Sequence, residues 1–152
     1  VTAEHTFDQL KHINDDEQAI IATNQNGDVV GYAISMTERS GRVMPIFDDL
    51  FDTVKGLEYE NNELAKSKII YVGQLCVDRD YRGQGLVQKL YGAFADKFRG
   101  EYDYVITDIS GQNPKSLKAH QKAGFVKIKS FYDSFSDSSW DIVLLDLGGW
   151  EG

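Results

Sequence analysis

The sequence predicts one compact domain of the α/β (α+β) class that spans residues 1–152. A chain of 152 residues with 41% hydrophobic residues has the length and composition of a single domain. Runs rich in β-branched and aromatic residues alternate with segments whose apolar residues recur every three or four positions. No repeat or low-complexity segment divides the chain, so we expect no second domain.

The first elements are predicted to be a helix and a β-hairpin. The helix covers residues 6–13, whose first residues have capping-box spacing and whose apolar residues share one face. Two strands follow over residues 18–23 and 28–36, because Asn26-Gly27 between them is typical of a tight β-turn. The polar stretch after the hairpin indicates irregular structure, with one short helix at 46–54.

The second half of the chain is predicted to alternate strands with helices. A glycine-rich turn links an apolar strand to a helix, and a second helix has Asn113 as its N-cap and Gly124 as its stop. Two final strands are expected to pair in antiparallel fashion. In chain order, these elements are a strand at 69–77, a helix ending near Phe98, a strand at 102–109, a helix at 114–123, and strands at 125–132 and 140–147.

Composition narrows the class of partner and the compartment. A net charge of −8 argues against nonspecific binding to nucleic acid or to an anionic membrane. Cys76 is the single cysteine, so no internal disulfide forms and a reducing cytoplasm is expected. No apolar run approaches the roughly 20 residues of a membrane-spanning helix, and no signal-peptide pattern opens the chain. We therefore expect a cytoplasmic protein.

The most informative motif is the turn Arg82-Gly83-Gln84-Gly85-Leu86-Val87. It lies where a buried strand turns into a helix, so backbone N–H groups are free there and the positive end of the helix dipole faces outward. Glycine lets an anion approach the main chain closely, which makes a diphosphate the natural ligand. The motif lacks the Gly-Lys-Ser/Thr of a P-loop and the third Gly or Ala of the Rossmann fingerprint. The alternative is a tight connection without a ligand.

This turn resembles the Gln/Arg-x-x-Gly-x-Gly/Ala motif of the GCN5-related N-acetyltransferase (GNAT) family. A second stretch, from Asn113 to Phe125, is similar to the family's Asn-x-x-Ala/Ser helix that ends in Gly-Phe. The matching region runs from about Ile69 to Phe131. The resemblance implies a mixed, mostly antiparallel central sheet flanked by helices. About 18 residues precede the first hairpin, which is too few for the family's usual strand and two helices, so we expect a shortened N-terminal part in which the first strand and helix are missing, abbreviated or outside this sequence.

The resemblance implies that acetyl-CoA (coenzyme A) is the cofactor. Backbone groups of Leu75, Cys76 and Val77 would pair with the pantetheine arm, and Arg82 would add a charge-assisted contact or remain a solvated turn residue. A buried, inert thiol is the favoured reading of Cys76. The backbone amides of Gly83 to Val87 would bind the pyrophosphate. The remaining cofactor-binding residues expected from the resemblance are Gly83, Gln84, Gly85, Leu86, Val87, Asn113 and Ser116.

Two residues are the catalytic candidates. His120 occupies the position where many family members have a tyrosine that protonates the leaving thiolate, and an imidazolium could do the same. The alternatives are that His120 is a hydrogen-bonded core residue, or that Tyr132 or Tyr104 supplies the proton. Asp108 resembles the carboxylate of the family's ribosomal-protein-acetylating branch and would be the general base, acting through a water. Its alternative role is to accept backbone hydrogen bonds at a strand end.

The acceptor is the least specified part of the site. Acidic residues crowd one segment and would attract a cationic amine if they flank the pocket, although a solvated surface is the simpler interpretation. They are Asp48, Asp49, Asp52, Glu58, Glu60 and Glu63. The expected partner is a small-molecule or peptide amine, with no nucleic acid and no membrane. The last two strands offer a face for a homodimer.

These observations indicate an acetyl-CoA-dependent N-acyltransferase that moves an acetyl group directly to a primary amine. We expect no metal. Two alternatives remain open from the sequence. One is a non-catalytic CoA-binding or regulatory domain with the same fold, and the other is a protein-interaction module that binds no cofactor.

Overall fold

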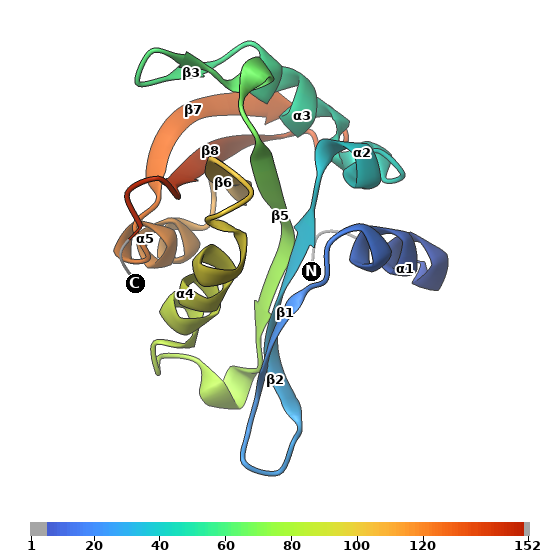
Figure 1. Cartoon of the computed structure of the whole chain (residues 1–152), viewed down its shortest axis with the longest axis vertical. Helices are drawn as coiled ribbons and strands as arrows, with labels where there is room; N and C mark the ends of the chain where they lie inside the picture. Colours follow the sequence, from blue (N-terminus) through green and yellow to red (C-terminus); the bar gives the residue numbers. More distant parts are fainter. Residues whose placement is uncertain (1–5, 151–152) are drawn as a thin grey trace.

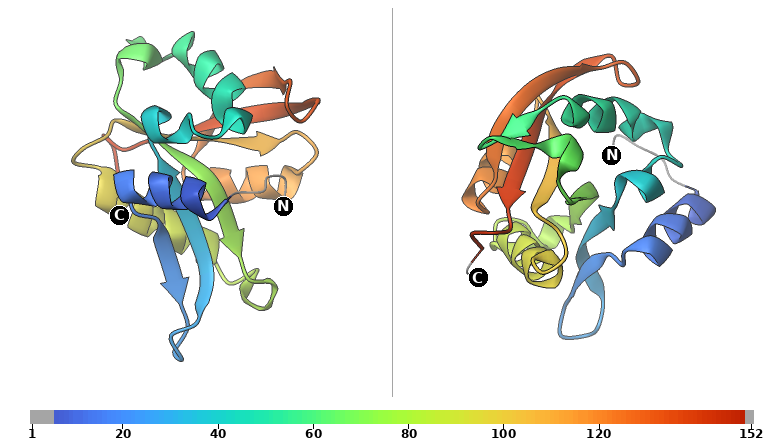
Figure 2. Two further views of the ribbon diagram at one scale, coloured as in Figure 1. Left: turned by 90° about the vertical axis from the view of Figure 1, so that its right-hand side faces the viewer. Right: turned by 45° about the horizontal axis from the view of Figure 1, so that its top comes forward.

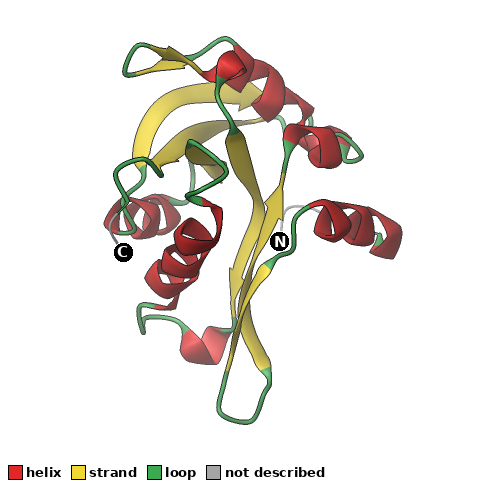
Figure 3. Cartoon of the chain, in the orientation of Figure 1, coloured by secondary structure: helices red, strands yellow, loops and turns green. Residues whose placement is uncertain are grey.

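A computed structural model describes residues 6–150 of the chain. One six-stranded sheet runs through the molecule, and helices cover both of its faces (Figures 1 and 3). The strand order is β1-β2-β5-β6-β8-β7. Only β5 and β6 run parallel, and the other four neighbouring pairs are antiparallel. The predicted mixed, mostly antiparallel sheet flanked by helices is therefore confirmed.

The N-terminal part holds one helix and the predicted hairpin. Helix α1 (Phe7–Asp16) begins with a capping box, in which Thr6 accepts from the Gln9 N–H and the Gln9 side chain accepts in return. Strands β1 (Ile20–Thr23) and β2 (Val29–Met36) pair in antiparallel fashion. Gly27 in their turn has a φ of 83°, the left-handed conformation that glycine adopts without strain.

The segment between β2 and β5 is more ordered than the sequence indicated. The predicted short helix is present, but further short elements surround it. The segment contains α2 (Glu38–Gly41), the 3₁₀ turn η1 (Pro45–Phe47), α3 (Asp48–Lys55), the small hairpin β3 (Glu58–Tyr59) and β4 (Asn62–Glu63), and the 3₁₀ turn η2 (Leu64–Lys66). In Figure 1 this segment lies over the end of the sheet where β7 and β8 curve.

The second half follows the predicted order with small shifts in the boundaries. Its elements are β5 (Ile69–Val77), the 3₁₀ turn η3 (Arg79–Tyr81), α4 (Leu86–Phe98), β6 (Tyr104–Ser110), α5 (Pro114–Lys122), β7 (Val126–Asp133) and β8 (Ser138–Asp146). Strands β7 and β8 form the predicted antiparallel pair. No helix within residues 6–150 has the length and apolar character needed to cross a membrane.

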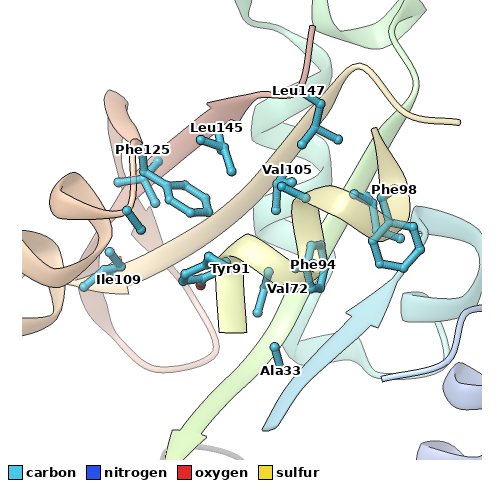
Figure 4. Close-up of a cluster of buried hydrophobic side chains, with 14 residues drawn as sticks. Ala33, Val72, Tyr91, Phe94, Phe98, Val105, Ile109, Phe125, Leu145 and Leu147 are labelled. Carbon is cyan, nitrogen blue, oxygen red and sulfur yellow. The ribbon is translucent and has the colours of Figure 1, made fainter. Parts of the chain in front are cut away.

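Two hydrophobic clusters lie on opposite faces of the sheet. On one face, α4 packs Tyr91, Phe94 and Phe98 against the sheet (Figure 4). On the other face, the cluster includes Ile13 of α1 and Phe51 of α3, among others. The two views of Figure 2 show the helices of the two layers with the sheet between them. Both clusters pack against the same sheet.

A glycine on α2 gives a test of the packing between α2 and α3. A Cβ added at Gly41 would lie 2.5 Å from Cζ of Phe51 and 2.9 Å from Sδ of Met36. Because both side chains are fully buried, Gly41→Ala should lower the free energy of unfolding by about 2 kcal/mol. Chemical denaturation would measure this change.

Gly92 is the matched control because it lies inside α4 and nothing lies within 4 Å of its added Cβ. Gly92→Ala should raise the free energy of unfolding by about 0.5–1 kcal/mol, since alanine is the better helix former. Equal stabilities for the two variants would contradict the packing described for α2.

Candidate functional site

The turn between β5 and α4 has the backbone geometry of an anion site. Gly83 and Gly85 have φ angles of 77° and 75°, so both adopt the left-handed conformation. The space beside them is open: nothing lies within 4 Å of a Cβ built on Gly83, and the nearest atom to one on Gly85 is Gln88 Oε1 at 3.9 Å. Arg82 Nε donates to the Val77 carbonyl (3.1 Å), which ties the turn to the end of β5.

Helix α4 begins without a side-chain cap. Its N-cap residue is Gly85, which has no side chain to accept from the first-turn N–H groups. By contrast, Thr6 caps α1 and Asn113 caps α5. The free N–H groups of α4 and the positive end of its dipole therefore face the open space at the glycine turn. An anionic ligand would supply the missing cap.

A groove of about 440 Å³ adjoins this helix end. One wall comes from the glycine turn and the first turn of α4, and the other comes from α5. The lining residues are Val77, Tyr81, Arg82, Gly83, Gly85, Leu86, Val87, Gln88, Lys115, Lys118, Ala119 and Lys122. Four of them carry a positive charge and none carries a negative one, in a chain whose net charge is −8. The groove is thus cationic although the protein as a whole is acidic, which favours a ligand with several negative charges.

Strands β5 and β6 separate next to this groove. They pair only from Ile69↔Tyr104 to Tyr71↔Ile106, and β5 then continues to Val77 with β2 as its only strand neighbour within residues 6–150. Thr107 Oγ1 donates to the Val72 carbonyl (2.9 Å) where the strands part. The β6-facing edge of β5 beyond that point is open to an extended ligand, which could add to it as another strand would.

A β-bulge in β5 was not predicted from the sequence. The register of β2 and β5 shifts between Ile34↔Gln74 and Ser35↔Val72, which leaves Gly73 without a partner on β2. A Cβ on Gly73 would lie 3.2 Å from Met36 Sδ and 3.5 Å from Phe47 Cζ. Glycine in the middle of an apolar strand is the sequence signal for such a bulge. The bulge redirects backbone groups beside the point where β5 and β6 part.

The structure brings together about half of the residues predicted to bind the cofactor. The groove is lined by Val77, Arg82, Gly83, Gly85, Leu86 and Val87. Leu75 and Cys76 lie on β5 beside the separation of the strands, with the Leu75 side chain packed toward the α4 face and Cys76 a free thiol. Gln84, Asn113 and Ser116 do not line the groove; Asn113 Oδ1 instead accepts from the Ser116 N–H (3.2 Å) as the cap of α5.

His120 is buried in the interior between α4 and α5. Its side chain is 5% exposed, its Nε2 lies 2.7 Å from the Tyr91 hydroxyl, and its Nδ1 lies 2.7 Å from the Ser116 carbonyl oxygen. Burial lowers the pKa of His120, although the Ser116 carbonyl opposes that change. These are the contacts of a neutral, fully hydrogen-bonded core histidine, the alternative that the sequence left open.

Asp108 lies on the opposite face of the sheet from His120. Its neighbours Thr107 and Ile109 point to the α4 side, because Thr107 bonds Val72 and Ile109 joins that cluster, so the Asp108 side chain points to the other side. Burial raises the pKa of Asp108 to about 7, and the negative charge of Asp133 adds to the rise. The two residues predicted to be catalytic are therefore not brought together.

Asp133 was not singled out from the sequence. It ends β7, is 5% exposed, and its Oδ2 accepts from the Ser136 N–H (2.8 Å). The pairing of β6 and β7 with β8 brings its charge close enough to affect Asp108, and no local pattern in the sequence reports that pairing. A carboxylate with a raised pKa and a second carboxylate nearby is a typical arrangement for proton transfer.

The two alternative tyrosines have different surroundings. Tyr104 is 6% exposed at the start of β6, and its hydroxyl accepts from Asn62 Nδ2 (3.2 Å). Tyr132 is 59% exposed on the edge strand β7. Neither lines the groove beside the glycine turn.

Three of the six acidic residues of this segment form internal ion pairs. Arg42 pairs with Asp48 (3.0 Å) and Asp52 (2.8 Å), and Lys66 pairs with Glu63 (2.7 Å). Asp49 Oδ2 accepts from both the N–H and the hydroxyl of Ser134, and these bonds lower the pKa of Asp49. The last contact fastens α3 to the β7–β8 turn, so these residues hold the segment together. Within residues 6–150, no group of three or more His, Cys, Asp or Glu residues could hold a metal ion.

Comparisons with known proteins agree with this arrangement. The model of the acetyltransferase (GNAT) family matches residues 2–125. The N-alpha-acetyltransferase 30 of Saccharomyces cerevisiae is 30% identical over 63 residues, which is 41% of this chain and 36% of that protein. The matched stretch thus spans about a third of that relative's length.

Solved structures show the same fold at low sequence identity. The NatC complex bound to Gag peptide and CoA aligns with a TM-score of 0.70 and 16% identity, over 96% of this chain and 82% of that one. A spermidine N-acetyltransferase SpeG chimera from Vibrio cholerae and hSSAT aligns with a TM-score of 0.64 and 14% identity, over 94% and 78%. The family match extends over most of the chain and agrees with the fold, so this chain belongs to the GNAT family of acetyltransferases.

Proposed function

We propose that this chain transfers an acetyl group from acetyl-CoA directly to a primary amine. One observation carries the proposal: the uncapped N-terminus of α4, with its two left-handed glycines, opens onto a groove that holds four cationic side chains. Coenzyme A carries a diphosphate and a further phosphate, so its charge matches this groove. Structural neighbours bound to CoA or acetyl-CoA support the same donor.

The residues present fit each part of the donor. The amides from Gly83 to Val87 would bind the diphosphate, and the lysines of α5 would neutralise the remaining phosphate. The pantetheine arm would lie along Leu75–Val77, where β5 has no strand partner on its β6 side within residues 6–150. Beside it, the bulge at Gly73 frees backbone groups that could polarise the thioester carbonyl.

Asp108 is the base that we propose for the reaction. Asp108 first takes the ammonium proton through a water, the neutral amine nitrogen then forms a bond to the acetyl carbon, the carbon–sulfur bond breaks, and the second proton that the nitrogen loses goes to the departing thiolate. A pKa of about 7 suits this role, because the carboxylate is then a stronger base than an ordinary aspartate and about half of the molecules hold it ionised at neutral pH. A thiol has a pKa of about 8.5, so the thiolate leaves readily and needs little assistance.

The acceptor that we propose is a peptide or small-molecule amine approaching from the Asp108 face of the sheet. The donor groove lies against α4 and α5, so an amine from the opposite face would meet the thioester where β5 and β6 part. The NatC neighbour holds a peptide, and the SpeG neighbours are spermidine acetyltransferases. The raised pKa of Asp108 and the nearby Asp133 carboxylate favour a catalyst over a regulatory CoA-binding domain.

Calorimetric titration with acetyl-CoA, followed by thiol release on an amine panel, tests the proposal. The panel should contain short peptides with free N-termini, spermidine, and an N-acetylated peptide as the unreactive control. We expect saturable binding near one donor per chain and thiol release with at least one primary amine but not with the acetylated peptide. A folded chain that binds no acetyl-CoA would refute the proposal, and binding without turnover on any amine would favour the regulatory alternative.

A further inference from the structure

We propose that His120 is a positioning residue, which together with Tyr91 fixes the spacing of α4 and α5 and so the width of the donor groove. This inference rests on the proposed function, because it concerns how the groove binds acetyl-CoA. It replaces proton donation as the role of His120. Three observations support the inference. They are the hydrogen bonds of the imidazole, the position of Tyr91 and His120 between α4 and α5, and the fact that these two helices form the walls of the groove.

The partners of the imidazole define its protonation state. The Ser116 carbonyl oxygen, 2.7 Å from Nδ1, can only accept, so Nδ1 carries the proton. In the neutral ring Nε2 is then an acceptor, and the Tyr91 hydroxyl, 2.7 Å away, donates to it. The Ser116 bond lies within α5 and holds the ring in one orientation. The Tyr91 bond then connects that ring to α4.

This contact is the polar link between the two walls of the groove. Within residues 6–150, no other hydrogen bond joins α4 to α5. Tyr91 is fully buried and packs edge-on against both His120 and Phe125, with ring centroids 5.1 Å and 4.6 Å apart, respectively (Figure 4 shows Tyr91 and Phe125). The link is therefore dry, and neither partner has water as a substitute.

The groove lies on the other side of the same helices. Tyr91 follows the first turn of α4, which lines the groove at Leu86, Val87 and Gln88. His120 lies one residue from Ala119, and α5 presents Lys115, Lys118 and Lys122 to the groove. The Tyr91–His120 bond thus sets how far the lysines lie from the N–H groups of α4. A displacement of about 1 Å at such a site weakens binding measurably, because several charges must meet the donor's phosphates together.

The surroundings of His120 argue against its acting on the thiolate. Both ring nitrogens are engaged at 2.7 Å, the side chain is 5% exposed, and it does not line the groove. To donate a proton, the ring would have to break one of these bonds inside the core. Asp108, the proposed base, lies on the opposite face of the sheet.

Two substitutions separate positioning from proton donation. Tyr91→Phe removes only the hydroxyl and leaves the imidazole in place. His120→Gln keeps an oxygen that can accept from Tyr91 but cannot act as an acid near neutral pH. Tyr102→Phe is the control, because its hydroxyl donates to Glu17 (3.0 Å) beyond the far end of α4 from the groove.

The measurements are the Kd for acetyl-CoA by calorimetry, KM and kcat with the best amine of the panel, and Tm. We expect Tyr91→Phe to raise both the Kd and the KM for acetyl-CoA about tenfold, while kcat stays within about twofold of the wild type. His120→Gln should keep kcat within about threefold, and Tyr102→Phe should change neither constant.

The opposite pattern would overturn the inference. If His120 donates the proton, His120→Gln lowers kcat about 100-fold or more and Tyr91→Phe leaves donor binding unchanged. A loss of Tm in both variants with unchanged Kd and kcat would show a role in stability alone. Failure of the wild type to bind acetyl-CoA is a separate result, seen before any variant is made, and it would remove the proposed function together with this inference.

Discussion

Asp108→Asn is expected to lower kcat by about 100- to 10,000-fold, the usual contribution of a general base. The amide has nearly the same size but cannot take a proton, so acetyl-CoA binding should change little. The measurement is kcat from thiol release, with calorimetry for the donor. A variant that keeps more than half of the wild-type kcat would show that Asp108 is not the base.

The pH dependence provides a second measurement on the same carboxylate. The base must be ionised, so wild-type kcat/KM should rise with pH through about 7, the pKa to which burial raises Asp108. Asp133→Asn removes the nearby charge that adds to that rise, so the midpoint should move to lower pH. A midpoint that does not move in Asp133→Asn would contradict the coupling between the two carboxylates.

Stability should change in the opposite direction to activity. The Asp108 carboxyl has a folded-state pKa of about 7 and an ordinary value of 3.8. Between these values the folded chain holds a proton that the unfolded chain has lost, so this group makes the free energy of unfolding fall as pH rises. At pH 8 the wild type contains a buried charge that Asp108→Asn lacks. The variant should therefore have the higher Tm at pH 8, and less of an advantage at pH 5.

Gly85→Asp is expected to weaken acetyl-CoA binding at least 100-fold. The new carboxylate would lie at the N-cap of α4, where the proposed diphosphate binds, and two like charges about 4 Å apart repel by about 4 kcal/mol near a protein surface. Aspartate is one of the few residues with a side chain that adopts the left-handed conformation, so the φ of 75° at this position should be tolerated. The folded chain should persist while the ligand is lost, and calorimetry with thermal unfolding would show both.

Gly85→Asn is the control for the shape and backbone strain of that substitution. Asparagine has the size of aspartate, tolerates the left-handed conformation and carries no charge. The nearest atom to the added Cβ is 3.9 Å away, so there is room for the side chain. Equal losses of binding in the two variants would show that no phosphate lies at the turn.

Most of the fold could be predicted because its signals are local. Asn26-Gly27 marked the hairpin, the unbroken apolar run marked β5, and Asn113 with Gly124 marked both ends of α5. The segment between β2 and β5 could not be predicted in the same way. Its short elements depend on contacts distant in sequence, such as Arg42 with Asp52 and Asp49 with Ser134.

In the candidate site too, the features set by local sequence could be predicted, and those set by contacts distant in sequence could not. The glycine turn is a local feature, so its place between a strand and a helix followed from the sequence, and the structure adds that both glycines are left-handed. The raised pKa of Asp108 depends first on burial in the folded chain and then on Asp133, which is 25 residues away and comes close only when β6 and β7 both pair with β8. His120 was given a chemical role from its position in a motif, whereas its environment is set by Tyr91, on a different helix. The position of a residue in a sequence motif does not show where its side chain points or which residues it contacts.

The separation of β5 from β6 has a mechanical consequence. The sheet consists of two antiparallel halves, β1-β2-β5 and β6-β8-β7, and three residue pairs join them. A donor lying along the open edge of β5 would contact both halves and act as a missing piece of the sheet. Its binding would therefore also hold the two halves of the sheet together, so the domain would become more rigid as the fraction of chains with bound donor rises. An inhibitor that bridged the two halves would gain affinity from that stiffening without touching the acetyl-transfer chemistry.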